Sequence, residues 1–264
     1  MITTEKTDKP KKNRDFERHG VYTSKNYTRT DPGGTDPGEN RFRFKNSLII
    51  TPNYETEFNA SGGIKYIKNH EDRLFFTNCG IYATTNNIQK MPVLIKRGIN
   101  KQSVQKKLIV EEKYNYEEKY EITKNIILYY EENRVDFQIL FIKSEENPNI
   151  KDITSEFFLS LSVPGIDDIV TYKKYNGKQE YKSFLSKFQN NSGDPDISDK
   201  SEDNLEYLVV GCGKRSMSCM TIYPDRRLLT EYRNKALCFI TPNISHQQKN
   251  YINLKIYLEN YRIT

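Results

Sequence analysis

The 264-residue chain lacks tryptophan and contains only four cysteines. Both shortages argue against certain classes of protein, namely zinc-binding and carbohydrate-binding domains. Its four cysteines, Cys79, Cys212, Cys219 and Cys238, form no C-x-x-C pair, and no Cys/His group has the spacing of a zinc site. We therefore expect buried free thiols in a reducing compartment, and no structural metal. Without tryptophan, the usual sugar-stacking residue, a carbohydrate-binding β-sandwich is disfavoured.

Long apolar runs and catalytic signatures are missing as well. The opening residues, MITTEKTDKPKKNRDF, are polar and unlike a secretion signal, and no segment approaches the roughly 20 apolar residues of a membrane helix. No G-x-S-x-G elbow occurs, and His19, His70 and His246 have no local partners that suggest a triad. We expect a chain made in the cytoplasm, with no membrane partner and no enzymatic activity.

Tyrosine is present in excess, with 19 residues against 13 phenylalanines at a mean hydropathy of −0.80. Residues 114–130, YNYEEKYEITKNIILYY, hold five tyrosines beside glutamates and lysines. Below about pH 10 a phenol is a neutral donor for these carboxylates, whereas above it the phenolate repels them. We predict that these tyrosines form an alkaline-sensing cluster. The assembly that contains them is expected to be stable at neutral pH and to dissociate in strong alkali. The members of the cluster are Tyr114, Tyr116, Tyr120, Tyr129 and Tyr130.

The chain divides into an arm over residues 1–40 and a body over residues 41–264. Asn13 can cap a short helix that Gly20 ends, and TDPGGTDPGEN then forms tight turns as a linker. Two helical turns do not hold themselves in water, so we expect this helix to dock elsewhere, with Phe16 as its apolar anchor. The predicted intermolecular arm consists of Asn13, Arg14, Asp15, Phe16, Glu17, Arg18 and His19.

The sequence of the body predicts β-strands throughout. Short runs rich in β-branched and aromatic residues recur every 10 to 15 residues without helical periodicity. IKYIKNHEDRLFF predicts a hairpin whose turn is NHED, and Asn-Gly in KYNGKQ predicts another. Residues 188–204 are polar and acidic, which is typical of a surface loop. The expected fold is all-β, a jelly-roll-like antiparallel β-sandwich.

The segment VVGCGKRSMS is the one candidate for binding a small anion. A phosphate-binding P-loop needs glycine where Leu208 stands and Ser or Thr where Arg215 stands, so that motif fails. A glycine-rich turn with two bases can still hold a phosphate, and a plain strand turn is the alternative. The candidate nucleotide or anion site comprises Gly211, Gly213, Lys214 and Arg215; we expect no required cofactor.

Several segments occur in the order found in the polyhedrins of cypoviruses, and the sequence resembles that family. They are NRDFER, IKYIKNHEDRLFF, YEEKYEITKNIILYY, FQILFIKSEENPNIK, YKKYNGKQEYKSF, LVVGCGKRSMS and ALCFITPNIS. The resemblance implies a jelly-roll-like sandwich with a projecting N-terminal helix, matched by residues 13–19, that locks neighbouring homotrimers into a crystal lattice. Some family members bind nucleotides. The chain departs from the family in lacking tryptophan and in its TDPGGTDPGEN insertion.

The expected function is therefore structural. The chain is expected to self-assemble in the host cytoplasm into crystalline occlusion bodies that embed virions, contact a virion surface protein and dissolve at alkaline pH. The alternative is a jelly-roll capsid protein that binds nucleic acid through a basic arm containing Lys6, Lys9, Lys11 and Lys12.

Overall fold

The structure is a computed structural model, and it describes residues 22–23, 43–45, 47–85, 88–102, 105–144, 154–163, 170–174, 179–180, 204–211, 218–233, 236–241 and 249–260. The predicted helix over 13–19 lies outside this set, and so do Gly213, Lys214 and Arg215. All but the last residue of the 188–204 loop also lies outside it. The helix of the arm, the linker and most of the candidate anion site therefore stay predictions.

Every described element is a β-strand, which confirms the all-β class, and the strands form two sheets. The ten-stranded sheet has the order β1 (Tyr22–Thr23), β8 (Val93–Gln102), β9 (Lys107–Tyr116), β10 (Tyr120–Tyr129), β11 (Arg134–Lys143), β19 (Lys249–Asn260), β16 (Ser218–Pro224), β15 (Leu205–Gly211), β13 (Val170–Lys174) and β14 (Gln179–Glu180). The nine-stranded sheet has the order β17 (Leu229–Arg233), β18 (Ala236–Thr241), β12 (Thr154–Ser162), β6 (Leu74–Thr85), β5 (Ile64–Asn69), β4 (Tyr54–Phe58), β3 (Leu48–Ile50) and β2 (Arg43–Lys45), with β7 (Ile88–Lys90) beside β6. Among the described strands, only β1 and β8 pair in parallel.

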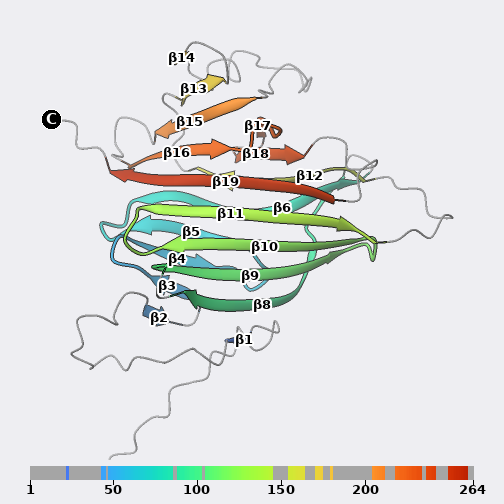
Figure 1. Cartoon of the computed structure of the whole chain (residues 1–264), viewed down its shortest axis with the longest axis horizontal. Coiled ribbons are helices and arrows are strands. Elements are labelled where there is room, and N and C mark those ends of the chain that lie inside the picture. Colours follow the sequence, from blue (N-terminus) through green and yellow to red (C-terminus); the bar gives the residue numbers. More distant parts are fainter. Residues whose placement is uncertain are drawn as a thin grey trace, which may run out of the picture.

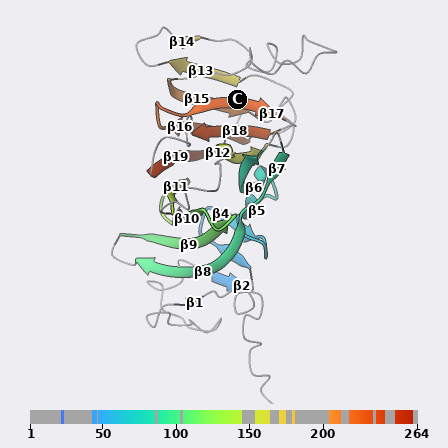
Figure 2. The same ribbon diagram turned by 90° about the vertical axis from the view of Figure 1, so that its right-hand side faces the viewer.

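The two sheets pack face to face as a sandwich (Figures 1 and 2). Aromatic rings from opposite sheets meet between them: Phe141 of β11 stacks on Phe157 of β12 with ring centroids 4.7 Å apart. Phe76 of β6 and Phe137 of β11 have centroids 6.3 Å apart. Aromatic contacts of this kind add to the hydrophobic gain of burial. The larger of the two hydrophobic clusters among the described residues therefore draws side chains from both sheets.

Buried and exposed residues alternate along the strands, as apolar and polar residues do in the sequence. In β9, every second residue from Leu108 to Tyr116 is buried, and the residues between them are more exposed. Successive side chains of a strand point to opposite faces, so alternation of apolar and polar residues turns one face toward the core. The tyrosine-rich residues 114–130 accordingly span the end of β9 and the whole of β10, as the strand pattern of the body predicted.

Both predicted hairpins are present. The β5–β6 pair turns at NHED, where the side-chain oxygen of Asn69 accepts hydrogen bonds from the backbone N–H groups of Glu71 at 3.0 Å and Arg73 at 2.9 Å. This arrangement is the Asx turn that asparagine favours. Strands β13 and β14 pair antiparallel on either side of the Asn-Gly segment.

Four strands lie outside the predicted runs: β1, β4, β7 and β17. The β4 sequence YETEF buries Tyr54, Thr56 and Phe58 while both glutamates point outward. The two glutamates made this segment look polar, although its buried and exposed residues alternate regularly.

No helix of the described chain is long and apolar enough to cross a membrane.

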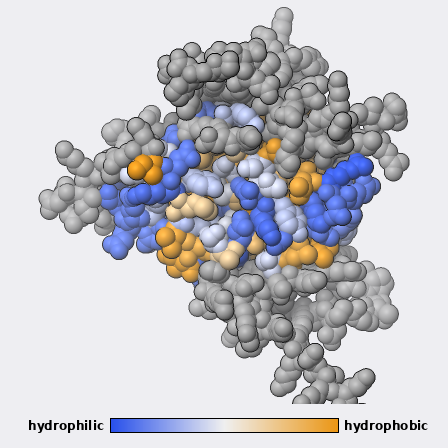
Figure 3. All heavy atoms as spheres, turned by 180° about the vertical axis from the view of Figure 1, so that it is seen from behind, coloured by the Kyte–Doolittle hydropathy of each residue, from blue (hydrophilic) through white to orange (hydrophobic). Residues whose placement is uncertain are grey.

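The described surface mixes hydrophilic and hydrophobic side chains. Seen from behind, the hydrophobic ones form small separate groups rather than one continuous patch (Figure 3). Single exposed apolar side chains are ordinary on soluble proteins. Exposed apolar residues do recur where the chain passes from β7 to β8, at Ile88, Met91, Val93 and Ile95.

Candidate functional site

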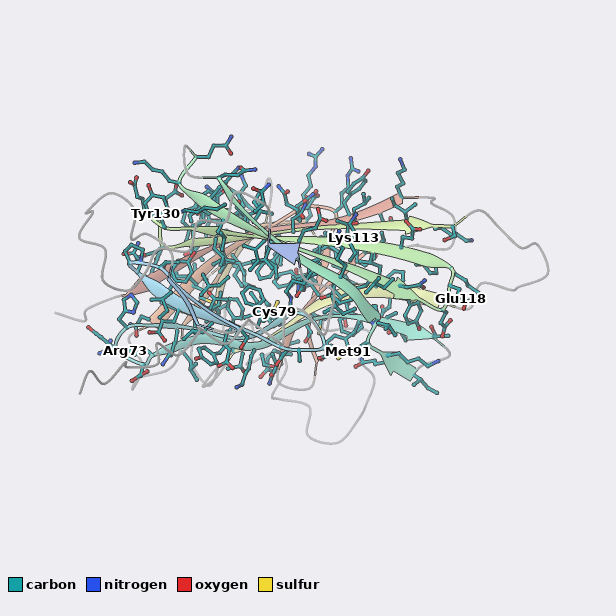
Figure 4. The ribbon with its side chains drawn as sticks, turned by 90° about the horizontal axis from the view of Figure 1, so that it is seen from below. Arg73, Cys79, Met91, Lys113, Glu118 and Tyr130 are labelled. Atoms are coloured by element: carbon teal, nitrogen blue, oxygen red, sulfur yellow. The ribbon has the colours of Figure 1, made fainter. Side chains whose placement is uncertain are left out.

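The five tyrosines of the predicted alkaline-sensing cluster share one hairpin but not one location. Tyr116 and Tyr120 lie opposite each other where β9 turns into β10. The last two tyrosines lie at the other end of β10, and a ten-residue strand is about 33 Å long. Figure 4 shows Tyr130 and Glu118 at opposite ends of the sandwich. With Tyr114 between the ends, the structure divides the tyrosines among three environments.

The first environment is aromatic. The rings of Tyr116 and Tyr120 both meet Phe157 edge-on, with centroids 5.5 Å and 4.9 Å from it. The hydroxyl groups of Tyr116 and Thr85 share a hydrogen bond of 2.5 Å. Burial raises the pKa of Tyr116. These two tyrosines therefore act as core residues of the sandwich.

The second environment is a fully buried carboxylate, Glu112, ringed by donors. The backbone N–H of Gly63 donates to both carboxylate oxygens at 3.0 Å and 3.1 Å. Arg97 donates from Nε at 2.8 Å and lies with Nη2 2.6 Å from Oε1. Tyr114 donates its hydroxyl to Oε2 at 2.5 Å, and Lys124 Nζ lies 3.4 Å from the same oxygen. We call Glu112, Arg97, Lys124 and Tyr114 the buried ion cluster.

Strand register brings these charges together. Arg97 of β8 and Lys124 of β10 are the direct cross-strand partners of Glu112 on its two sides. All three occupy inward positions that hydrophobic residues fill elsewhere on the same strands. Opposite charges placed directly across two antiparallel strands attract each other. The cluster therefore follows from the alternation that builds the sheet.

Two cations face one carboxylate in this cluster, and aromatic faces supply further stabilisation. Arg97 also donates to the backbone oxygen of Asn59 at 2.7 Å and lies 5.3 Å from the ring centroid of Phe58. The Lys124 ammonium lies 5.7 Å from the centroid of Phe137 and makes no hydrogen bond to the described residues. Its contact with Glu112 is therefore an ion pair at 3.4 Å rather than a directed hydrogen bond.

Burial and charge shift the acidities in and beside this cluster. Burial alone would raise the pKa of Glu112, but Lys124, Arg97 and the Tyr114 hydroxyl outweigh it and lower this pKa to about 2. Burial, reinforced by the Glu112 charge, raises the pKa of Tyr114 well above its ordinary value. Burial also raises the pKa of the Cys79 thiol to about 12, and this residue lies between the sheets (Figure 4). In and beside this cluster, one carboxylate, Glu112, is therefore ionised, while the Tyr114 phenol and the Cys79 thiol stay neutral.

Gly63 is required by the geometry around Glu112, which leads to a prediction. Its φ is +78°, and a Cβ there would lie 2.3 Å from the backbone oxygen of Cys79. We expect Gly63→Ala to lower the free energy of unfolding by about 2–3 kcal/mol, measured by urea denaturation. Gly80→Ala is the matched control, because its Cβ would approach only side chains, Tyr82 at 3.4 Å and Met91 at 3.5 Å. Equal losses for the two variants would contradict this account.

The third environment lies at the far end of β10. The buried hydroxyl of Tyr54 donates to the backbone oxygens of Tyr129 at 2.9 Å and Arg134 at 3.1 Å. Burial raises the pKa of Tyr54 well above its ordinary value. Tyr130 donates to the carboxylate of Glu131 at 3.1 Å. Tyr54 was absent from the predicted cluster, and its place in the alternation of YETEF is the sequence signal that identifies it.

On the outer side of the ten-stranded sheet, side chains line up across five strands. The Arg134 guanidinium lies 4.5 Å from the ring centroid of Tyr129 and 5.5 Å from that of Tyr257. Tyr257 meets Tyr223 edge-on at 5.7 Å, and Tyr223 lies 6.0 Å from Tyr207. We call these five residues the tyrosine ladder. Its members come from β10, β11, β19, β16 and β15.

Asp136 fixes one end of the ladder. It accepts from Arg134 Nε at 2.8 Å and Nη2 at 2.6 Å, and from the Tyr129 hydroxyl at 3.1 Å. Burial, followed by the charge of Asp136, raises the pKa of Tyr129 to about 12. The hydrogen bonds to Asp136 raise the pKa of Arg134, so the guanidinium stays charged. A two-pronged pair of this kind holds both side chains in one orientation.

The candidate anion site is described only at its first residue. Gly211 ends β15, where it pairs with Cys219 of β16. No group of three or more His, Cys, Asp or Glu residues that could hold a metal ion is found among the described residues. No disulfide bond joins the described cysteines, Cys79, Cys219 and Cys238.

Comparisons with known proteins identify the fold of the chain but not its family or its activity. No protein-family model matches the chain, and no curated protein matches it. Solved structures do match over 81% of this chain: an α-mannosidase from Enterococcus faecalis at 10% identity and a TM-score of 0.54, and an α-N-acetylgalactosaminidase from Bifidobacterium bifidum at 6% and 0.54. A glycosyl hydrolase family 38 protein from Enterococcus faecalis matches at 9% and 0.53, again over 81% of this chain. The match covers 29%, 36% and 30% of these three proteins respectively, so the chain corresponds to about a third of each. At these identities the likeness shows a shared two-sheet β architecture and assigns no activity.

Proposed function

We propose that the chain is a structural protein that assembles with copies of itself into particles, stable at neutral pH and dispersed by strong alkali. This is the function of the polyhedrins that the sequence resembles. In this proposal the sandwich is jelly-roll-like, residues 13–19 form the helix that joins homotrimers, and the particles embed virions in the host cytoplasm. The observation that carries the proposal is the burial of three weak acids in the interior, Tyr54, Tyr114 and Cys79, which raises the pKa of each.

The direction of the pH effect follows from these acids. An unfolded tyrosine has a pKa near 10, and burial raises the pKa of Tyr54 and Tyr114 well above that value. The folded chain therefore keeps protons that the unfolded chain releases. Their contribution to stability is fully present below about pH 10 and is lost as the pH rises further. Cys79 acts in the same direction from about pH 9 to its folded pKa of about 12.

In this proposal most of the tyrosines act inside the protomer rather than at contacts between molecules. Tyr114, Tyr116 and Tyr120 are buried within one chain, so alkali acts first on the stability of the protomer. Loosening the protomer removes the rigid surfaces on which a lattice depends. Tyr129, half-buried on the outer face, is the member of the predicted cluster best placed to act at a contact between molecules.

Expression of the full chain alone in insect cells tests the proposal. We expect micron-scale particles that survive washing in neutral buffer and contain this chain as their main protein. Hollow shells that retain nucleic acid and release it with rising salt would favour the capsid alternative instead. Soluble protein without particles would contradict self-assembly.

A further inference from the structure

The outward row of β19 combines exposed rings with charges of both signs. Tyr251 is 53% exposed, and Lys255 is exposed as well. Tyr257 and Glu259 follow on the same face at intervals of two residues. Across the strand pair, Tyr223 is 40% exposed and lies directly opposite Lys255. The face is therefore neither apolar nor of one charge.

Two rings of this face, those of Tyr257 and Tyr223, are held in place before any partner arrives. Tyr257 lies between Arg134 at 5.5 Å and Tyr223 at 5.7 Å, and Arg134 is itself fixed by Asp136. Ordering side chains on association costs free energy, so a surface whose rings are already ordered loses less on binding. Tyrosine and arginine are also the residue types enriched at the centres of protein interfaces.

The charge pattern of β19 is complementary to itself. Lys255 lies two residues before Tyr257 and Glu259 two residues after it, so all three share one face of the strand. Neither Lys255 nor Glu259 has an ion-pair partner among the described residues, although Glu259 accepts a long hydrogen bond of 3.5 Å from Thr221. An antiparallel copy of the same row, centred on Tyr257, places each lysine against the other copy's glutamate.

We propose that the outer face of the ten-stranded sheet around the tyrosine ladder binds a second copy of the chain. The two β19 strands run antiparallel across the contact, with Tyr257 near the two-fold axis and two Lys255–Glu259 pairs around it. In such a two-fold contact each residue pair occurs twice. This inference rests on the proposed function, because it names one surface through which the self-assembly takes place.

A charge swap tests the contact. Lys255→Glu places two carboxylates against each other, and Glu259→Lys places two ammonium groups against each other; each pairing occurs twice. We expect either variant to weaken dimerisation about tenfold or more, measured by sedimentation equilibrium at neutral pH and low ionic strength. The double variant restores opposite charges and is expected to dimerise within about threefold of the wild type.

Lys65→Glu is the matched control, because it makes the same change of charge at an exposed position of β5 in the other sheet. We expect its dimerisation to equal that of the wild type, and circular dichroism melting checks that all variants fold. A monomeric wild type, single variants that dimerise normally, or a double variant no better than the singles would overturn the inference.

Particle formation is scored separately on the same variants. Wild-type particles together with normal dimerisation of both single variants would overturn this surface and leave the proposed function intact. A wild type that forms no particles but shows the charge-swap pattern in solution would support the surface and overturn the proposed function.

Discussion

Glu112→Ala is expected to lower the free energy of unfolding by about 3–5 kcal/mol, because it leaves Arg97 and Lys124 buried without their carboxylate. Folded proteins are stable by roughly 5–15 kcal/mol, so this one change removes a large part of the total. Urea denaturation followed by far-UV circular dichroism measures the loss directly.

Glu111→Ala provides the control for that experiment. Glu111 is the neighbouring residue on β9, points to the outer face and has Lys113 3.8 Å away as an exposed ion-pair partner. Exposed pairs contribute about 0–1 kcal/mol, so this variant should be nearly as stable as the wild type. A loss for Glu112→Ala as small as that for Glu111→Ala would contradict the role assigned to the buried ion cluster.

Stability is expected to fall steeply above about pH 10. Each acid that ionises only in the unfolded chain removes about 1.4 kcal/mol per pH unit. Tyr54, Tyr114 and Cys79 are all buried with raised pKa values, so together they remove about 4 kcal/mol per unit once all three titrate in the unfolded chain. Two pH units at this slope are comparable to the whole stability of an ordinary domain.

Single variants separate this effect from general alkaline damage. We expect Tyr114→Phe to flatten the dependence of unfolding free energy on pH by about 1.4 kcal/mol per unit between pH 10 and 12. Tyr251→Phe is the control, because its ring is 53% exposed in the folded chain, and its slope should match the wild type. Urea titrations at fixed pH values between 8 and 12 supply both slopes, and parallel curves for all three proteins would rule out the interior mechanism.

Local patterns in the sequence were enough to predict much of the fold. The alternation in β9 and β10 and the turn chemistry at Asn69 act over a few residues, so the strands and the β5–β6 hairpin were predictable. The position of β19 between β11 and β16 was not, because it joins segments far apart in the chain. No short turn fixes the register of β19 against β11 and β16, and the tyrosine ladder depends on this register.

The buried ion cluster was missed although the sequence carries a signal for it. Glu112 and Lys124 each interrupt an apolar alternation, between Val110 and Tyr114 in one strand and between Ile122 and Ile126 in the next. Opposite charges at inward positions of neighbouring strands predict a buried pair. The closeness of the tyrosines in residues 114–130 predicted one cluster, whereas the length of β10 separates its two ends.

The most direct test of the central claim is the alkaline dissolution of particles formed by the chain. Particles of the wild type and Tyr114→Phe are titrated from pH 7 to 12 while turbidity and released protein are followed. The account predicts that wild-type particles dissolve above about pH 10, where phenols ionise, and that Tyr114→Phe particles dissolve at higher pH. Particles that dissolve at the same pH in both proteins, or that persist to pH 12, would contradict it.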